Sequence, residues 1–196
     1  MALEQTPTGE QNLQICEAAG TLAIDLGSTT TVVAFQSAQT AGPQLLELGA
    51  ISRSPGQVPS LIWAKGADDP SPLVGRQVLD AGLEDSDAPQ LLRDFKRKIG
   101  APSAAPSAAN HLSPEAAAEL LLQQIWTRLP EGLQIQRLVL TAPVEHYRGY
   151  RHWLMQASEH LPVNEVALVD EPTAAALGAG LAPGARLLVV DIGGST

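Results

Sequence analysis

The chain has 196 residues, of which 44% are hydrophobic, and its formal net charge at pH 7 is −9. A chain of this length and composition can bury a sizeable core, and a single globular domain is the default expectation. Its acidic balance argues against a general nucleic-acid-binding surface and against binding to an anionic membrane, because both partners favour clustered Lys and Arg.

Residues 1–20 are rich in Gln, Glu, Thr and Gly and have little hydrophobic periodicity, which predicts a disordered N-terminal extension. The same segment has neither a basic start nor an apolar stretch, so it predicts no secretory signal and no membrane span. Cys16 is the single cysteine, which rules out an intrachain disulfide. We therefore expect a soluble, cytoplasmic protein.

The first half of the folded part begins with three closely spaced strands, predicted over residues 21–25, 31–36 and 44–50. Turn residues separate them, which indicates a meander. Residues 51–86 are rich in Pro, Gly and Asp and predict loops with one or two short strands. A helix is predicted over residues 88–99.

An Ala/Pro/Ser tract over residues 101–110 predicts a flexible connector to the second half. Ser113, Pro114 and Glu115 then predict a helix start, with an N-cap, a first-turn proline and a first-turn acid. Its expected buried stripe is Ala118, Leu121, Leu122, Ile125 and Leu129. Strands and helices alternate after it, over residues 137–141, 147–161, 165–169, 173–180 and 186–190. This alternation predicts parallel strand pairing with helices packed on the sheet.

Two similar turns lie at opposite ends of this pattern, over residues 22–30 and 188–196. In each, an apolar strand leads through an aspartate into a turn of glycines and hydroxyl residues. Glycine allows a ligand to approach the backbone closely, hydroxyls and amides donate to phosphate oxygens, and an aspartate can hold a hydrated divalent cation. One such turn also closes ordinary hairpins, but two in matching contexts predict a phosphate clamp. The order indicates one structural repeat and the opening strand of a second.

Six motifs occur in the order of a known family. They are Ile24-Asp25-Leu26-Gly27-Ser28-Thr29, Val58-Pro59-Ser60 with Leu73-Val74-Gly75, Phe95-Lys96-Arg97-Lys98-Ile99-Gly100, Leu138 to Pro143 with Arg151, Asp170-Glu171-Pro172-Thr173-Ala174-Ala175-Ala176, and Asp191-Ile192-Gly193-Gly194-Ser195-Thr196. Together they resemble the nucleotide-binding domain of the seventy-kilodalton, DnaK-type heat-shock chaperones, within the actin-like ATPase superfamily. The likeness covers residues 21–196.

The resemblance implies an α/β fold, the first lobe of an actin-like ATPase of ribonuclease H-like type. Its mixed five-stranded sheet would be flanked by helices in the order βββαβαβα, followed by the first strand of the second lobe. An outer subdomain over about 51–112 would be reduced, because the segment after Gly100 is short. The chain would end at the second phosphate loop.

The resemblance also implies a site for ATP or ADP with Mg²⁺. Lys96 would lie against the γ-phosphate and the attacking water. Asp25, Glu171 and Asp191 would hold hydrated magnesium, with Glu171 or Asp191 as proton acceptor. The phosphate-binding residues would be Gly27, Ser28, Thr29, Gly193, Gly194, Ser195 and Thr196. An allosteric relay would run through Pro143 and Arg151.

Each role has a structural alternative. Lys96 could belong to a solvated basic helix face, and Asp170-Glu171-Pro172 could be a strand-to-helix turn. Pro143 could simply end a strand and Arg151 could lie on a helix surface. Alternative functions are an actin-like filament or segregation ATPase, a small-molecule kinase of the same superfamily, and a one-lobe interaction module without catalysis.

The leading hypothesis is the ATP-binding and ATP-hydrolysing part of a DnaK-like chaperone. Unfolded client peptides and co-chaperones would bind only through parts beyond residue 196. Because the family's site forms between two lobes, we expect this chain alone to bind ATP weakly and to hydrolyse it little.

Overall fold

The computed structural model describes residues 18–66, 68–101, 112–144 and 148–180, together with 184, 186 and 188–190. The predicted extension therefore lies outside the described residues except for 18–20, which already belong to the first strand. Nearly all of the predicted connector and the whole of the predicted second phosphate loop, residues 191–196, also lie outside them. Within the described part, no helix is long and apolar enough to cross a membrane.

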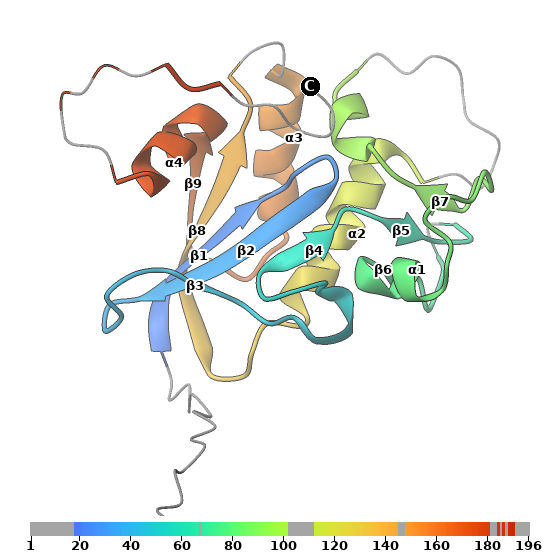
Figure 1. The fold of residues 1–196 in the computed structure, drawn as a ribbon, viewed down its shortest axis with the longest axis horizontal. Coiled ribbons are helices and arrows are strands. Elements are labelled where there is room, and N and C mark those ends of the chain that lie inside the picture. Colours follow the sequence, from blue (N-terminus) through green and yellow to red (C-terminus); the bar gives the residue numbers. More distant parts are fainter. Residues whose placement is uncertain are drawn as a thin grey trace, which may run out of the picture.

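A mixed sheet forms the centre of the molecule, with the strand order β3-β2-β1-β8-β9 and β4 paired to β2 (Figure 1). Its strands are β1 (Ala18–Asp25), β2 (Thr30–Ser37), β3 (Gln44–Leu45), β4 (Gln57–Pro59), β8 (Leu133–Ala142) and β9 (Glu165–Asp170). β1 pairs antiparallel with β2 and parallel with β8, and β8 pairs parallel with β9. The predicted α/β class is confirmed, with an antiparallel meander in the first half and alternating strands and helices in the second. β4 adds a sixth strand to the five expected.

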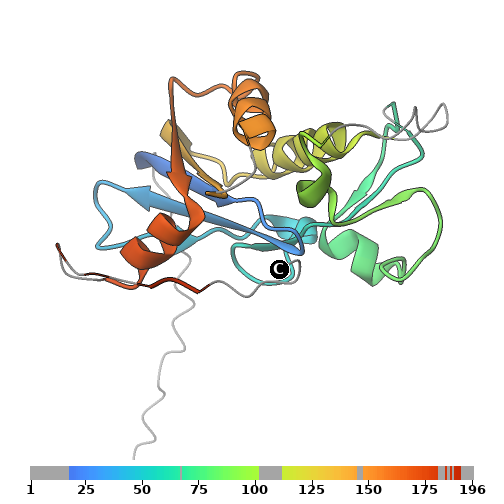
Figure 2. The same ribbon diagram turned by 90° about the horizontal axis from the view of Figure 1, so that it is seen from above.

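Three helices pack on this sheet: α2 (Pro114–Trp126), α3 (Arg148–Ser158) and α4 (Glu171–Gly178). Figure 2 shows α2 and α3 on one face and α4 on the other. The main core lies under α2 and α3, because β1 and β8 turn alternate apolar residues toward them. It includes Leu22, Ile24, Leu138, Leu140 and Leu121, all fully or almost fully buried. α4 has no buried residue, so its face of the sheet is less covered.

A smaller three-stranded sheet lies beside the central one, with the order β6-β5-β7. Its elements are β5 (Ile62–Trp63), β6 (Leu73–Val74), α1 (Arg76–Asp80) and β7 (Leu91–Leu92). Two 3-10 helices flank it in sequence, η1 (Gly49–Ile51) and η2 (Phe95–Lys98). These short elements place η2, and Lys96 within it, next to α2.

Two local predictions are wrong. The helix expected over residues 88–99 is instead β7 followed by η2, because Leu91 and Leu92 pair with β5 and Asp94 takes a left-handed conformation with φ 54°. A left-handed residue cannot continue a right-handed helix. The strand expected over residues 44–50 ends after Leu45, and η1 follows with Gly49 at φ 61°.

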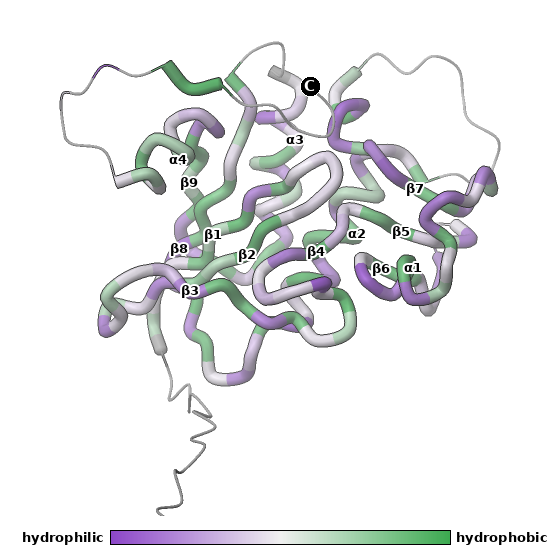
Figure 3. The backbone as a smooth tube through the Cα atoms, in the orientation of Figure 1, coloured by the Kyte–Doolittle hydropathy of each residue, from purple (hydrophilic) through white to green (hydrophobic). Residues whose placement is uncertain are grey.

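The strand expected over residues 186–190 is not formed by the described residues 186 and 188–190. Leu188, Val189 and Val190 are exposed, and they form a hydrophobic run outside both sheets (Figure 3). A strand is stable only when a neighbour satisfies its backbone N–H and C=O groups. The described sheet ends at β9, so this run has no strand partner among the described residues.

The predicted start of α2 is confirmed at the level of single atoms. Ser113 is the N-cap, its Oγ accepts a hydrogen bond from the Ala116 backbone N–H at 3.1 Å, and Pro114 occupies the first turn. Of the predicted stripe, Ala118, Leu121, Leu122 and Ile125 are buried, and Leu129 packs against the core while partly exposed.

Candidate functional site

The turn predicted to be the first phosphate loop lies between β1 and β2, and Ser60 holds it in place. The Ser60 Oγ donates to the carbonyl oxygen of Gly27 at 2.7 Å and exchanges a hydrogen bond with the buried Thr31 hydroxyl at 2.9 Å. The Ser60 backbone N–H also donates to the carbonyl oxygen of Thr29 at 2.9 Å. A Cβ at Gly27 would lie 2.1 Å from the Thr30 carbonyl oxygen, so only glycine fits this turn. The tight conformation of the turn is thus fixed by its own glycine and by the hydrogen bonds from Ser60.

The parallel strands bring predicted site residues to one edge of the central sheet. Asp25 is the last residue of β1, and its Oδ1 accepts a hydrogen bond from the Thr141 hydroxyl near the end of β8. Asp170 ends β9 opposite Ala142 in the same direction, and Glu171 begins α4 directly after it. Carboxyl ends of parallel strands are where ligands of α/β sheets bind. Because β8 lies between β1 and β9, Asp25 and Asp170 end strands that are two strand spacings apart, roughly 10 Å.

Lys96 reaches this edge from η2. Its Nζ lies 2.6 Å from Oε1 of Glu171, and the two side chains are 11% and 24% exposed. The same Nζ lies 5.9 Å above the ring centroid of the fully buried Tyr150. Neighbouring Arg97 and Lys98 are exposed. The solvated-face alternative for Lys96 is therefore wrong, because its side chain is largely shielded from water. A shielded ammonium needs a partner, and the Glu171 carboxylate is that partner.

A contact between two glycines holds the turn after Lys96 against α3. A Cβ at Gly100 would lie 2.9 Å from the Cα and carbonyl carbon of Gly149, and a Cβ at Gly149 would lie 3.0 Å from the Cα of Gly100. The Gly100 backbone N–H also donates to Oε1 of Glu115 in the first turn of α2, at 2.8 Å. These contacts position Lys96 over Tyr150. Sequence reasoning missed Gly149 and Tyr150 and identified Glu115 only as a first-turn acid of the helix. A glycine at a predicted helix start was the one available signal for Gly149.

Arg151 on α3 forms an ion pair with Asp170, with Nη1 2.8 Å from Oδ1. Both side chains are about two-fifths exposed, at 41% and 39%, so water screens the pair and its own contribution to stability is small. Pro143 directly follows β8. The ion pair joins Arg151 to Asp170, the residue before Glu171. The sequence did not identify Asp170 as the partner of Arg151.

The predicted magnesium ligands are only partly described. Asp191 lies outside the described residues, as do Gly193, Gly194, Ser195 and Thr196 of the second loop. Among the described residues, no group of three or more His, Cys, Asp or Glu side chains gathers to form a metal cage. Asp25 and Glu171 offer carboxylate oxygens, the donors that Mg²⁺ prefers, and Mg²⁺ usually keeps several waters. The donor set therefore fits a hydrated ion bound through few protein groups.

No protein-family model matches the chain. The chain does match individual proteins, and three of them are named chaperone protein DnaK. The one from Mycoplasma mobile is 27% identical over 180 residues, which are 89% of this chain and 28% of the relative. Those from Thermosipho melanesiensis and Halobacterium salinarum are 26% and 27% identical over 179 and 180 residues, or 88% and 89% of this chain.

The chain is a relative of the DnaK chaperones. Identity is low, but the DnaK matches agree with one another and cover nearly all of this chain. The chain spans 28% of the length of the first of these relatives.

Proposed function

We propose that this chain is the first lobe of an ATP-binding and ATP-hydrolysing unit in a DnaK-like chaperone that assists protein folding. The observation that carries the proposal is the shielded Lys96–Glu171 pair at 2.6 Å. It joins two residues far apart in the sequence at the sheet edge where Asp25 also lies. Phosphoryl transfer needs positioned charge and an oriented water more than covalent chemistry, and these groups can supply both.

Each residue takes a defined role in this proposal. Lys96 stabilises negative charge on the γ-phosphate, and its pairing with Glu171 fixes its direction before nucleotide arrives. Glu171 accepts a proton from the attacking water. Gly27, Ser28 and Thr29 offer backbone and hydroxyl donors to phosphate oxygens. Bound Mg²⁺ supplies charge neutralisation at the phosphates, and Asp25 and Glu171 would hold it through water, with Asp191 as the proposed third carboxylate.

The domain assignment belongs to the same proposal. Residues 21–196 form the first lobe with a reduced outer subdomain over about 51–112, and Pro143 and Arg151 relay the nucleotide state. In this proposal the site forms between two lobes, of which residues 21–196 supply the first. A site without its second wall binds ATP weakly and hydrolyses it slowly. Client peptides and co-chaperones would act through regions that the DnaK relatives have in addition, in the cytoplasm.

The test is MgATP binding by calorimetry and single-turnover hydrolysis, in the longest natural product that contains this chain. Lys96→Ala should abolish most hydrolysis and Asp25→Asn should weaken the dependence on magnesium. Arg97→Ala is the matched control, because Arg97 is the exposed neighbour of Lys96. Unchanged hydrolysis in Lys96→Ala would contradict the proposal. ATP-dependent, salt-sensitive sedimentation would support the filament alternative, and phosphorylation of a sugar would support the kinase.

A further inference from the structure

Lys96 has two partners, and they belong to different helices. Its Nζ lies 2.6 Å from Oε1 of Glu171, the first residue of α4, and 5.9 Å above the ring centroid of Tyr150 on α3. An ammonium within about 6 Å of an aromatic centroid is attracted by the negative face of the ring. Because the Lys96 side chain is only 11% exposed, water screens this attraction little.

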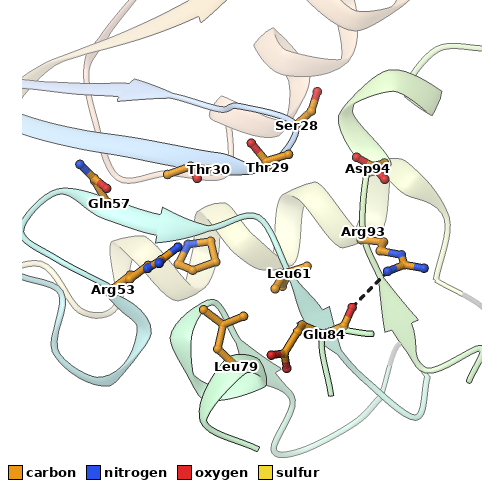
Figure 4. A pocket seen from close by; sticks show the side chains of 11 residues that line it. Ser28, Thr29, Thr30, Arg53, Gln57, Leu61, Leu79, Glu84, Arg93 and Asp94 are labelled. Carbon is orange, nitrogen blue, oxygen red and sulfur yellow. Dashed lines mark hydrogen bonds between the residues drawn. The ribbon is translucent and has the colours of Figure 1, made fainter. Parts of the chain in front are cut away.

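The side chain of Lys96 is directed away from the cavity beside the segment that leads to η2. This cavity has a volume of about 450 Å³, and Arg93 and Asp94 line it (Figure 4). Lys96 follows two residues after Asp94, but neither Lys96 nor Tyr150 belongs to the wall of the cavity. The ammonium therefore lies at the contact between η2, α3 and α4, where the carboxylate and the ring are its partners.

Packing fixes the place of the Tyr150 ring. Tyr150 is fully buried, and the ring of Trp153 packs against it with 5.5 Å between the centroids and 54° between the planes. Nε1 of Trp153 in turn donates to Oε1 of Glu119 on α2 at 3.1 Å. The residue before Tyr150, Gly149, is in close contact with Gly100. The ring thus has a defined position relative to both α2 and the turn after η2.

The two partners of Lys96 respond differently to a proton. This step rests on the proposed function, in which Glu171 accepts a proton from the attacking water. The protonated carboxyl is neutral and no longer balances the Lys96 ammonium, which stays shielded from water. A shielded charge without a partner is costly. The ring of Tyr150 is unchanged by this proton transfer, so its attraction for the ammonium persists.

We propose that Tyr150 is a positioning residue whose ring holds the Lys96 ammonium at the sheet edge independently of Glu171. The ring keeps Lys96 directed toward the γ-phosphate while Glu171 gains and loses its proton. An aliphatic side chain could fill much of the same space but offers no attraction for an ammonium. If Tyr150 only fills space, leucine at this position leaves Lys96 in place; if the ring holds the ammonium, leucine releases it.

The experiment is NMR spectroscopy of the full 196-residue chain with labelled lysine, without nucleotide. The chain has three lysines, and the exposed Lys65 and Lys98 serve as references. Protons above a ring face shift upfield, so the Hε signals of Lys96 should lie upfield of both references. We expect this shift to remain in Tyr150→Phe and in Glu171→Gln and to be lost in Tyr150→Leu. Its absence from the wild-type chain, its survival in Tyr150→Leu or its loss in Glu171→Gln would overturn the proposal.

Hydrolysis kinetics in the longest natural product that contains this chain give a second readout. Tyr150→Leu should lower kcat for MgATP about tenfold and leave KM nearly unchanged, because the ring acts on the direction of Lys96 and not on nucleotide binding. Tyr150→Phe should retain most of the wild-type kcat. Wild-type kcat in Tyr150→Leu would refute the role of Tyr150 and leave the proposed function standing. A wild-type protein that hydrolyses no ATP would contradict the proposed function, and the lysine signals would still decide whether Tyr150 holds Lys96.

A control and a substitute variant separate this role from lost stability. Leu138→Ala removes a fully buried side chain in the middle of β8, four residues before the strand end, and should change neither kcat nor the Lys96 signals. Should Tyr150→Leu fail to fold, Tyr150→Met takes its place in both measurements, because methionine adapts to irregular space and has no ring. An unchanged Lys96 shift in a folded Tyr150→Met variant would count against the proposal in the same way.

Discussion

Replacing Gly100 by alanine tests how the turn after Lys96 is held against α3. Gly100 has φ 72°, a left-handed conformation that costs other residues about 1–2 kcal/mol. A Cβ there would also lie 2.9 Å from backbone atoms of Gly149 and 3.0 Å from the Tyr150 nitrogen. Backbone atoms cannot rotate away as a side chain can, so we add an overpacking cost of about 1–3 kcal/mol. The expected loss for Gly100→Ala is the sum, about 2–5 kcal/mol of unfolding free energy.

Gly82 provides the matched control. It has φ 65°, and a Cβ at this position would meet nothing within 4 Å. Gly82→Ala therefore carries the left-handed strain alone, about 1–2 kcal/mol. The difference between the two variants isolates the close approach of Gly100 to α3.

Both variants would be measured by urea denaturation and by thermal unfolding, followed by circular dichroism. A kilocalorie shifts the melting temperature of a domain of this size by about 2–4 °C, so Gly100→Ala should melt about 2–12 °C below Gly82→Ala. Unfolding free energies that agree within about 0.5 kcal/mol would refute the reasoning. In that case the contact with Gly149 would impose no constraint on the turn.

Three further changes test the site and its surroundings. Ser60→Ala removes the hydroxyl that binds the Gly27 carbonyl, and urea denaturation should show a loss of about 1–3 kcal/mol; no measurable loss would contradict the role of Ser60. Glu171→Leu leaves Lys96 shielded without a partner and should cost about 1–3 kcal/mol, whereas adding Lys96→Met should recover most of it in a double-mutant cycle; purely additive losses would count against the pair. Backbone N–H groups, first that of Lys65, donate to Asp69 and hold the pKa of its carboxyl below the usual 3.8. The stability from this turn is present above pH 3.8 and is lost as pH falls through the lower folded pKa; an NMR titration midpoint at or above 3.8 would be inconsistent with these bonds.

The features that the sequence predicts well depend on local pattern. The start and buried stripe of α2 follow from Ser113, Pro114 and apolar spacing, because capping and amphipathic periodicity act within a few turns of helix. The meander and the parallel strands follow from short apolar runs in a recognisable order. The tight turn after β1 follows from one glycine and one aspartate at a strand end, and in the structure Gly27 cannot be any other residue.

Pairing between distant segments decided the rest. Residues 88–99 have helical composition, but Leu91 and Leu92 pair with β5, and the hydrogen bonds of that pairing outweigh the small local preference for helix. The same non-local packing removes Lys96 from solvent and gives it Glu171, which is 75 positions away, as its partner.

The sequence by itself therefore determined the class of fold, the position of the tight turn between β1 and β2 and the identity of the candidate charged groups. Only the tertiary structure decided which of those groups meet, that a contact between Gly100 and Gly149 holds the turn after Lys96, and that the Lys96 ammonium lies above the ring of Tyr150. The reason is physical. Local propensities act over a few residues and are worth tenths of a kilocalorie to about 1 kcal/mol, whereas burial and charge pairing depend on neighbours that are distant in the sequence.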